Sequence, residues 1–217
     1  MKRPPGRFFG SGALALLVAA LLCTAILQGQ KRVRKTLLDP AVQSVVIDGA
    51  QCFHISLETA ETREVLVEAE MEGEYQSEVM VITETLGNTL RISTGFAPSF
   101  QMPNDKLGAH KVLSVRLRVV LPRHQRVSLV AGSCRVETTG VFRDLKVQIA
   151  EGGCLLAHTA EHTEVTTASA PITAQIGQGV VEAHSRYGQV FLEAIPPGDP
   201  EFVLRSTRGD IRVSRRL

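Results

Sequence analysis

Five short blocks of one form follow one another in the second half of the chain, and they constrain its fold more than any other feature. Each block has an apolar residue, a few small or polar residues, and a second apolar residue at which a new strand starts. The blocks are VAGSCRVET, IAEGGCLLA, VTTASAPITA, AHSRYGQVFL and LRSTRGDIRV. The strands restart at Val136, Leu156, Ile172, Val190 and Ile211, with spacings of 20, 16, 18 and 21 residues. One such unit cannot bury its own apolar side, so we expect the units to stack.

One position within the blocks accepts only small residues. Gly209 matches Gly188 directly, and the other blocks have Cys134, Cys154 and Ala170 in the same place. A tight bend between two strands imposes such a restriction on side-chain size. Gly188 and Gly209 are therefore predicted turn positions.

The last block contains Arg208-Gly209-Asp210, a tripeptide that many cell-surface receptors bind. The sibling blocks explain this glycine as a turn residue without any ligand, and a match of three residues needs a confirming context. The surrounding segment RSTRGDIRVSRRL holds five arginines. We expect these polar residues to cover the open end of the stack, where strand edges would otherwise be exposed.

The segment 43–122 also consists of strand-like runs separated by turn residues. REVLVEAEMEG alternates apolar and charged residues with a period of two, which is typical of a half-buried strand. EVMVITETLGNTLRIST predicts a hairpin with Gly87-Asn88 in its turn, and KVLSVRLRVVLP predicts a longer strand that ends at Pro122. No amphipathic helix pattern follows residue 40.

We therefore expect an all-β fold in the segment 43–213, with hairpins over 43–122 that run into repeat rungs over 127–213. The repeat predicts an irregular β-solenoid with rungs of roughly 16–21 residues. The alternative is an antiparallel β-sandwich, which also shows many short strands with turns.

The segment 1–35 has a different character. Residues 8–27 carry no charge, and as a helix these twenty residues would span about 30 Å, the thickness of a bilayer core. We expect an uncleaved single-pass anchor that follows an N-terminal basic cluster. The alternative is a cleaved signal peptide, although Leu27-Gln28-Gly29 is a poor cleavage site. The second basic cluster, Lys31 to Lys35, is expected to lie against the outer membrane face.

The charge of the chain excludes one large class of functions. The net charge of +2 is uneven, because residues 1–35 hold seven basic and no acidic residues. The remaining chain holds 17 basic and 22 acidic residues, a net charge of −5. Such a domain lacks the basic surface that binding to phosphates requires, so we expect no nucleic-acid partner.

Motifs for catalysis or metal binding are absent from the sequence. It contains no Gly-x-Ser-x-Gly, Ser-x-x-Lys, His-Glu-x-x-His or Cys-x-x-Cys pattern, and no phosphate or dinucleotide loop. His158 and His162 have a spacing that would suit a metal on a helix, but their surroundings predict a strand, on which they would lie about 13 Å apart. We therefore expect no catalytic residue, metal, cofactor or small-molecule substrate.

Two cysteines occupy equivalent places in consecutive blocks. Neighbouring strands lie about 4.8 Å apart, so Cys134 and Cys154 could form a disulfide between rungs in an oxidising compartment. The alternative is a pair of free, buried thiols, for which the small-residue position is equally suitable.

Nine acidic residues cluster between Glu58 and Glu84, with only Arg63 opposing them in that segment. Many alternate with apolar residues, so we expect a solvated strand face. A cation-binding or basic-partner surface is a minority interpretation, and so is a carboxylate pair of a polysaccharide enzyme. The scarcity of aromatic residues, at 5% of the chain, disfavours stacking on sugars.

Several stretches in this order resemble the bacterial auto-transporter adhesin head domain, also called the GIN domain. They are VQSVVIDGAQCFHISL, the acidic strand EVLVEAE, the hairpin GNTLRIS, RLRVVLP, and the repeats that follow. The resemblance covers roughly residues 43–213. It implies an all-β repeat fold displayed in the cell envelope, without a catalytic signature.

These observations together predict a non-enzymatic, membrane-anchored envelope protein that faces the periplasm and binds another envelope protein, a polymer or a surface. The first alternative is an envelope-stress sensor that binds a membrane partner. The second is a polysaccharide-acting enzyme. Cleavage of the leader would instead give a secreted or surface-exposed protein.

Overall fold

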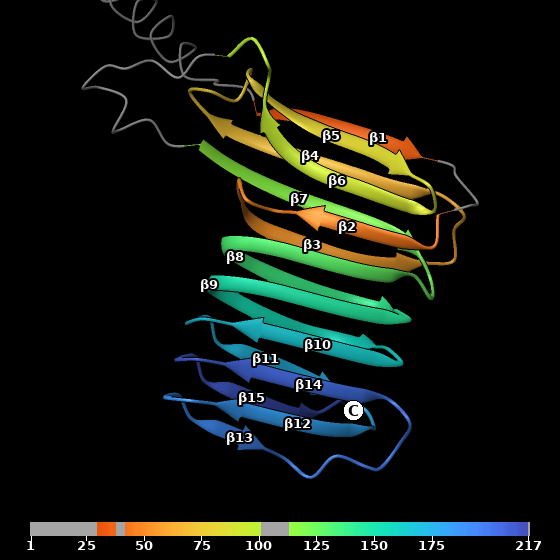
Figure 1. The fold of residues 1–217 in the computed structure, drawn as a ribbon, viewed down its shortest axis with the longest axis vertical. Helices are drawn as coiled ribbons and strands as arrows, with labels where there is room; N and C mark the ends of the chain where they lie inside the picture. The colour runs from red at the N-terminus through yellow and green to blue at the C-terminus, as the bar shows by residue number, and fades with distance from the viewer. Residues whose placement is uncertain (1–29, 38–41, 101–112, 217) are drawn as a thin grey trace, which may run out of the picture. The chain divides into compact units, whose positions relative to one another are not determined.

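The structure is a computed structural model that describes residues 30–37, 42–100 and 113–216. The chain divides into two compact units, Met1–Gln30 and Lys31–Leu217, and the strands all belong to the second. Among the described residues there are fifteen β-strands and no helix (Figure 1). The prediction of an all-β fold is confirmed. The segment 8–27 lies outside the described residues.

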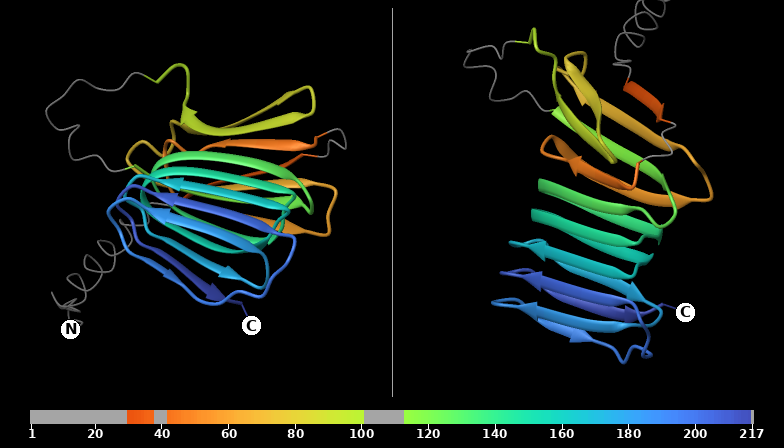
Figure 2. Two further views of the ribbon diagram at one scale, coloured as in Figure 1. Left: turned by 60° about the horizontal axis from the view of Figure 1, so that its bottom comes forward. Right: turned by 45° about the vertical axis from the view of Figure 1, so that its right-hand side comes forward.

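The strands form one sheet that is folded into two rows, because β8 (Arg126–Val141) and β9 (Asp144–Thr159) bend and continue from the first row into the second. The first row contains, in spatial order, β5 (Val79–Leu86), β6 (Thr89–Phe96), β2 (Ser44–Asp48), the first halves of β8 and β9, β10 (His162–Thr167), β14 (Glu201–Ser206) and β12 (Val180–Ser185). The second contains β1 (Lys31–Leu37), β4 (Val65–Gly73), β7 (Leu113–Pro122), β3 (Cys52–Ala60), the second halves of β8 and β9, β11 (Ile172–Ile176), β15 (Ile211–Arg215) and β13 (Val190–Leu192). The sheet is not closed (Figure 2).

The hairpin predicted around Gly87-Asn88 is confirmed. β5 and β6 pair antiparallel, with Leu86 opposite Thr89. Gly87 has a φ of 61°, a conformation that glycine adopts at no steric cost and that a tight hairpin turn requires. The predicted strand that ends at Pro122 is β7, and it pairs with β4 on one side and β3 on the other.

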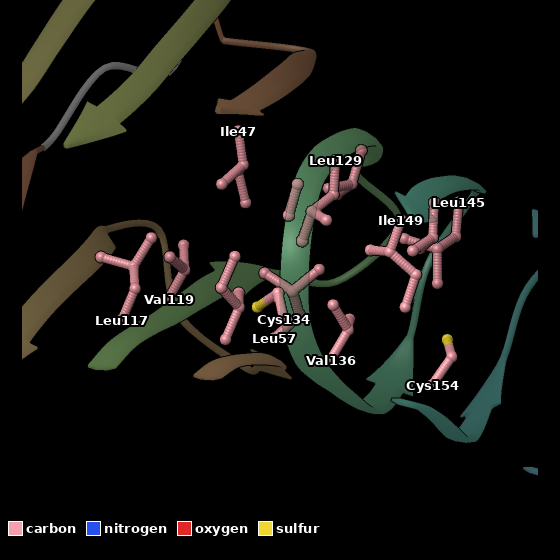
Figure 3. Packing of buried hydrophobic residues seen from close by; sticks show 14 of the residues in the cluster. Ile47, Leu57, Leu117, Val119, Leu129, Cys134, Val136, Leu145, Ile149 and Cys154 are labelled. Carbon is pink, nitrogen blue, oxygen red and sulfur yellow. The ribbon is translucent and has the colours of Figure 1, made fainter. Parts of the chain in front are cut away.

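From β8 to the end of the chain, every pair of neighbouring strands is parallel. Parallel, in-register pairing places equivalent side chains above one another, so the inward-facing residues form continuous columns between the two rows. One column in the second row contains Val136, Cys154, Ile172, Ile211 and Val190. The first four are buried, and Figure 3 shows part of this core. The columns explain why apolar residues recur at intervals of about twenty residues.

We call a strand of the first row and the strand that follows it in the second row a rung, for example β12 with β13. The spatial order of these rungs differs from their order in the sequence. After β12 and β13, the chain turns back and inserts β14 between β10 and β12, and β15 between β11 and β13. The inserted rung contributes the larger and more deeply buried apolar side chains, including Phe202 and Leu204. The rung left at the end contributes Val181 and Ala183, which remain partly exposed. This order places Phe202 and Leu204 on a strand that has a neighbour on each side.

This insertion corrects one expectation. The segment with five arginines does not cover the open end of the stack, because β14 and β15 are interior strands and β12 and β13 form the end. Gly188 and Gly209 lie in the bends that follow β12 and β14.

The close approach at the β14–β15 bend predicts a specific sensitivity. A Cβ atom on Gly209 would lie 2.2 Å from the carbonyl oxygen of Ala170, whereas one on Gly177, in the bend after β11, would meet no atom within 4 Å. We expect Gly209→Ala to lower the free energy of unfolding by about 1–3 kcal/mol through overpacking. Gly177→Ala should change it by less than about 0.5 kcal/mol. Urea unfolding followed by circular dichroism compares them, and equal losses would contradict the stacked-bend geometry.

Candidate functional site

One end of the stack is closed by lysine side chains. β5 is the edge strand there, and its free carbonyls are those that point away from β6. Lys31 Nζ donates hydrogen bonds to the carbonyls of Ser77 (2.8 Å) and Val79 (2.9 Å), and Lys35 Nζ donates one to Val81 (2.6 Å). Charged lysines that occupy an edge protect it from pairing with another strand. The described sheet thus begins at Lys31, earlier than residue 43.

The outer face of the second row carries a ladder of ion pairs. Glu68 and Glu70 on β4 lie between arginines of β1 and arginines of β7 (Arg116 and Arg118). Arg118 Nη1 lies 2.9 Å from Glu68 Oε2, and its Nη2 lies 2.8 Å from Glu58 Oε2. The ion pairs are Arg32–Glu70, Arg34–Glu68, Arg116–Glu70, Arg118–Glu68 and Arg118–Glu58. The prediction of a solvated acidic strand face holds for these glutamates.

The arginines of this ladder were missed in the sequence because they lie outside the acidic segment. The runs KRVRK and VRLRV alternate basic and apolar residues just as VEAEM alternates acidic and apolar ones, so a comparison of these patterns could have found the pairing. The hydrogen bonds from Arg118 hold the pKa of Glu58 below its ordinary value. A glycosidase acid needs the opposite shift, so Glu58 does not fit that role.

The other end of the stack is open. β12 pairs with β14 and β13 pairs with β15, and no other described strand lies beyond them (Figure 1). Large apolar side chains are exposed on this terminal rung and the bend within it: Val180, Tyr187, Val190, Phe191 and Leu192. Unpaired strand edges are typical of interaction surfaces. This open end is the strongest candidate for a binding surface.

The tripeptide of the last block belongs to an interior rung. Gly209 is buried, and its N–H donates to Ser206 Oγ at 2.8 Å. The Asp210 carboxylate accepts a hydrogen bond of 2.9 Å from the N–H of Gln189 in the neighbouring bend. The second of these contacts connects the bends of the last two rungs.

His158 and His162 lie in different environments. His158 is buried, with Nδ1 2.7 Å from Thr138 Oγ1 and Nε2 2.9 Å from Thr163 Oγ1. His162 is partly exposed and lies 3.1 Å from Glu201 Oε2. No cluster of three or more His, Cys, Asp or Glu residues that could hold a metal occurs in the described part of the chain.

The three described cysteines are free and buried. Cys134 is opposite Gly152 on β9, whereas Cys154 is opposite Val136 on β8. The two thiols are therefore two residues out of register, which adds about 7 Å along the strand to the spacing between strands. Figure 3 shows the two side chains apart in the core. This offset disfavours the bridge, which requires Cα atoms within about 7 Å.

Over residues 30–37, 42–100 and 113–216, no helix is long and apolar enough to cross a membrane. The segment 8–27, for which a membrane helix is expected, is outside these ranges, as is Cys23.

A comparison with protein-family models gives no match, and neither does a comparison with curated protein sequences. The fold is similar to the solved structure of a candidate cell adhesion protein from Clostridium sporogenes, with 10% identity and a TM-score of 0.61 over 87% of this chain and 100% of that chain. Two candidate adhesins, from Bacteroides fragilis and Parabacteroides merdae, match with 10% and 11% identity and TM-scores of 0.39 and 0.42. They cover 87% and 84% of this chain, and 98% and 81% of their own. The first likeness shows an adhesin-like fold.

Because His158 is buried, we expect the protein to lose stability in mild acid. Burial, with a smaller contribution from Arg216, lowers the pKa of His158 from 6.5 to about 4. Between these values the unfolded chain binds a proton that the folded chain does not, so the free energy of unfolding falls as the pH falls. The loss approaches about 3 kcal/mol near pH 4. Urea unfolding at several pH values should show it.

The variant His158→Gln, whose side chain does not titrate, should flatten this pH dependence. A pH profile that is the same in both proteins would show that His158 is not the group responsible.

The burial of the three thiols leads to an expectation about their reactivity with a thiol reagent. Burial raises the pKa of Cys52 to about 11 and those of Cys134 and Cys154 to about 12. A maleimide should therefore leave these residues unmodified in the folded protein and modify them all after unfolding without reductant. Peptide mass spectrometry separates the outcomes, since protection of Cys134 and Cys154 in the unfolded, unreduced chain would establish the bridge.

Proposed function

We propose that this protein is a non-enzymatic binding protein of a bacterial cell envelope, held at the membrane by residues 8–27 and working through the open end of its stack. The contrast between the two ends carries this proposal. Lysines occupy the outward carbonyls of Val79 and Val81 on β5, whereas β12 and β13 have unpaired edges that no described lysine covers. A soluble domain protects such edges unless a partner covers them.

The fold supports this proposal through its likeness to the candidate cell adhesion protein. We further propose that the parallel rungs over residues 127–213 constitute an irregular β-solenoid, and that residues 43–213 are related to the adhesin head (GIN) domain. In this division β1 joins the folded domain, and the anchor is confined to the residues that precede it.

The chemistry of the open end favours a protein partner over a polymer. It presents backbone N–H and C=O groups next to apolar side chains, which is the combination that an added β-strand satisfies. Stacking on sugars needs aromatic platforms, and this rung offers only Tyr187 and Phe191, each already covered by an arginine at 5.0 and 5.3 Å from its ring centre.

A matched pair of double variants tests the open end. Val180→Ser with Phe191→Ser removes exposed apolar groups there, and Met80→Ser with Ile82→Ser removes similarly exposed groups from the closed end. We expect the first pair to weaken binding of the full chain, in detergent, to envelope preparations from its own bacterium by at least about 10-fold. The second pair should change it little. Equal effects of the two pairs would place the binding surface elsewhere.

Location is tested separately, by cell fractionation and N-terminal sequencing. An intact Met1 in the membrane fraction, with residues 40–217 digested only after the outer barrier is opened, is expected for an anchored periplasmic protein. A start near Gln30 in a soluble or surface fraction would replace the anchor with a cleaved leader.

A further inference from the structure

β12 directs half of its backbone hydrogen-bonding groups out of the stack. The N–H groups of Val180 and Arg186 donate to the carbonyls of Pro200 and Ser206 on the β14 side, at 2.8 and 3.1 Å. Successive residues of a strand point to opposite neighbours, so the alternate residues Val181, Ala183 and Ser185 present their N–H and C=O groups at the open edge. A strand that binds here must pair with these three residues.

Lysines make the closed end a poor source of that strand. Head-to-tail stacking of two molecules would place β12 on β5 and β13 on β1. The outward carbonyls of Val79 and Val81 on β5 already accept hydrogen bonds from Lys31 and Lys35. A head-to-tail contact would also leave an open end on every assembly and would extend into a fibre. The contact that closes is isologous, with one open end against another.

A two-fold contact places β12 antiparallel to its own counterpart, and only a few registers are open to it. The edge-facing residues of β12 have odd numbers, and in an antiparallel pair each must be opposite an edge-facing residue of the second copy. The numbers of two opposite residues therefore add up to an even number. Nearly full overlap of Val180–Ser185 leaves two registers. In the first, Glu182 would be opposite Glu182 of the second copy, and like charges directly opposite are destabilising.

In the second register, Ala183 is opposite Ala183 of the second copy and Val181 is opposite Ser185. Glu182 is then opposite His184 of the second copy, and the symmetry makes this contact twice. A histidine ring N–H can donate to a carboxylate whether the ring is neutral or charged. Glu182 and His184 are exposed on the outer side of β12. The Glu182 carboxylate lies 3.2 Å from Arg205 on the neighbouring β14, so it would exchange this partner for, or share it with, His184 of the second copy.

The facing row fits the same symmetry. β13 is the terminal strand of its row, and Phe191 and Leu192 are about half exposed, at 47% and 50%. A two-fold axis through the middle of β12 and perpendicular to the sheet sets β13 against its own counterpart. Such a contact would cover the free edges of both strands.

We infer that the open end binds a second copy of this chain, with β12 antiparallel to its counterpart and Glu182 opposite His184 of the second copy. The inference rests on the proposed binding role of the open end and names its occupant. It makes the contact homophilic, between molecules of one kind.

Disulfide trapping tests the register on the full chain in detergent. Antiparallel residues in a non-hydrogen-bonded pair have Cα atoms about 4.5 Å apart, which is within the range of a disulfide. In a Cys23→Ser background, Glu182→Cys is made with one affinity tag and His184→Cys with another. Under a mild oxidant we expect the two variants to cross-link to each other when mixed, and neither to cross-link to itself.

The Cys23→Ser chain is the control, and it should remain uncross-linked because its other cysteines are buried. Self-cross-linking of either single variant, or no cross-link in the mixture, would overturn the inference.

A charge exchange provides an independent measurement. Glu182→Lys faces a histidine, and His184→Glu faces a glutamate, so each single variant should weaken the dimer by at least about 10-fold in sedimentation experiments on the full chain. The double variant places a lysine opposite a glutamate at both contacts and should return to within about 3-fold of the parent.

The parent protein should sediment as a dimer, and a folded, monomeric parent would overturn the inference. If such a monomer still lost envelope binding through Val180→Ser with Phe191→Ser, the proposed function would stand and its partner would be a different protein. If the dimer formed but envelope binding did not depend on this surface, the self-contact would stand and the proposed function would fail.

Discussion

Parallel, in-register pairing of strands is the constraint on which the rest of this structure depends. Each strand from β8 onward satisfies its backbone through the strands above and below, and its inward side chains pack onto the same column. A rung without neighbours would leave both its apolar side and its backbone groups in water. Stability therefore accumulates from rung to rung, and the two ends become the places where the pairing must be terminated or continued by another molecule.

The strand edges at the two ends of the stack are covered to different extents. At the N-terminal end, antiparallel β1 and the lysines it carries take up the free carbonyls of β5, and the ladder of arginines and glutamates connects β1 to β4 and β7. Exposed ion pairs of this kind contribute little stability individually, but opposite charges facing each other across strands favour the observed register over its alternatives. At the other end, the rung with the smaller apolar side chains is left without a neighbour, and no lysine covers its edge.

The buried polar side chain of His158 is also paired with its neighbours. His158 lies between two threonine hydroxyls and packs edge-on against Phe142, so the buried ring is hydrogen-bonded at both nitrogens. Cysteines occupy positions in the core beside small or branched residues, and burial keeps their thiols protonated. These groups contribute to packing, and the chemistry that the molecule offers to partners is on its surface and at its open end.

Local pattern was sufficient to predict the class of fold, the hairpin at Gly87-Asn88, the alternation of the acidic strand and the small-residue bends around Gly188 and Gly209, because strand periodicity and turn chemistry act between near neighbours in the chain. It was insufficient for the register between β8 and β9, in which Cys154 is opposite Val136 and not Cys134. The pairing keeps an offset of 18 residues from Arg126↔Asp144 to Val141↔Thr159, and an alignment that is wrong by two residues buries the same face, so the pattern could not reveal the error. It also could not show that β14 and β15 insert before β12 and β13. That choice, and with it the identity of the open end, depends on which rung gains more by burial on both sides, and only the packed tertiary structure decides it.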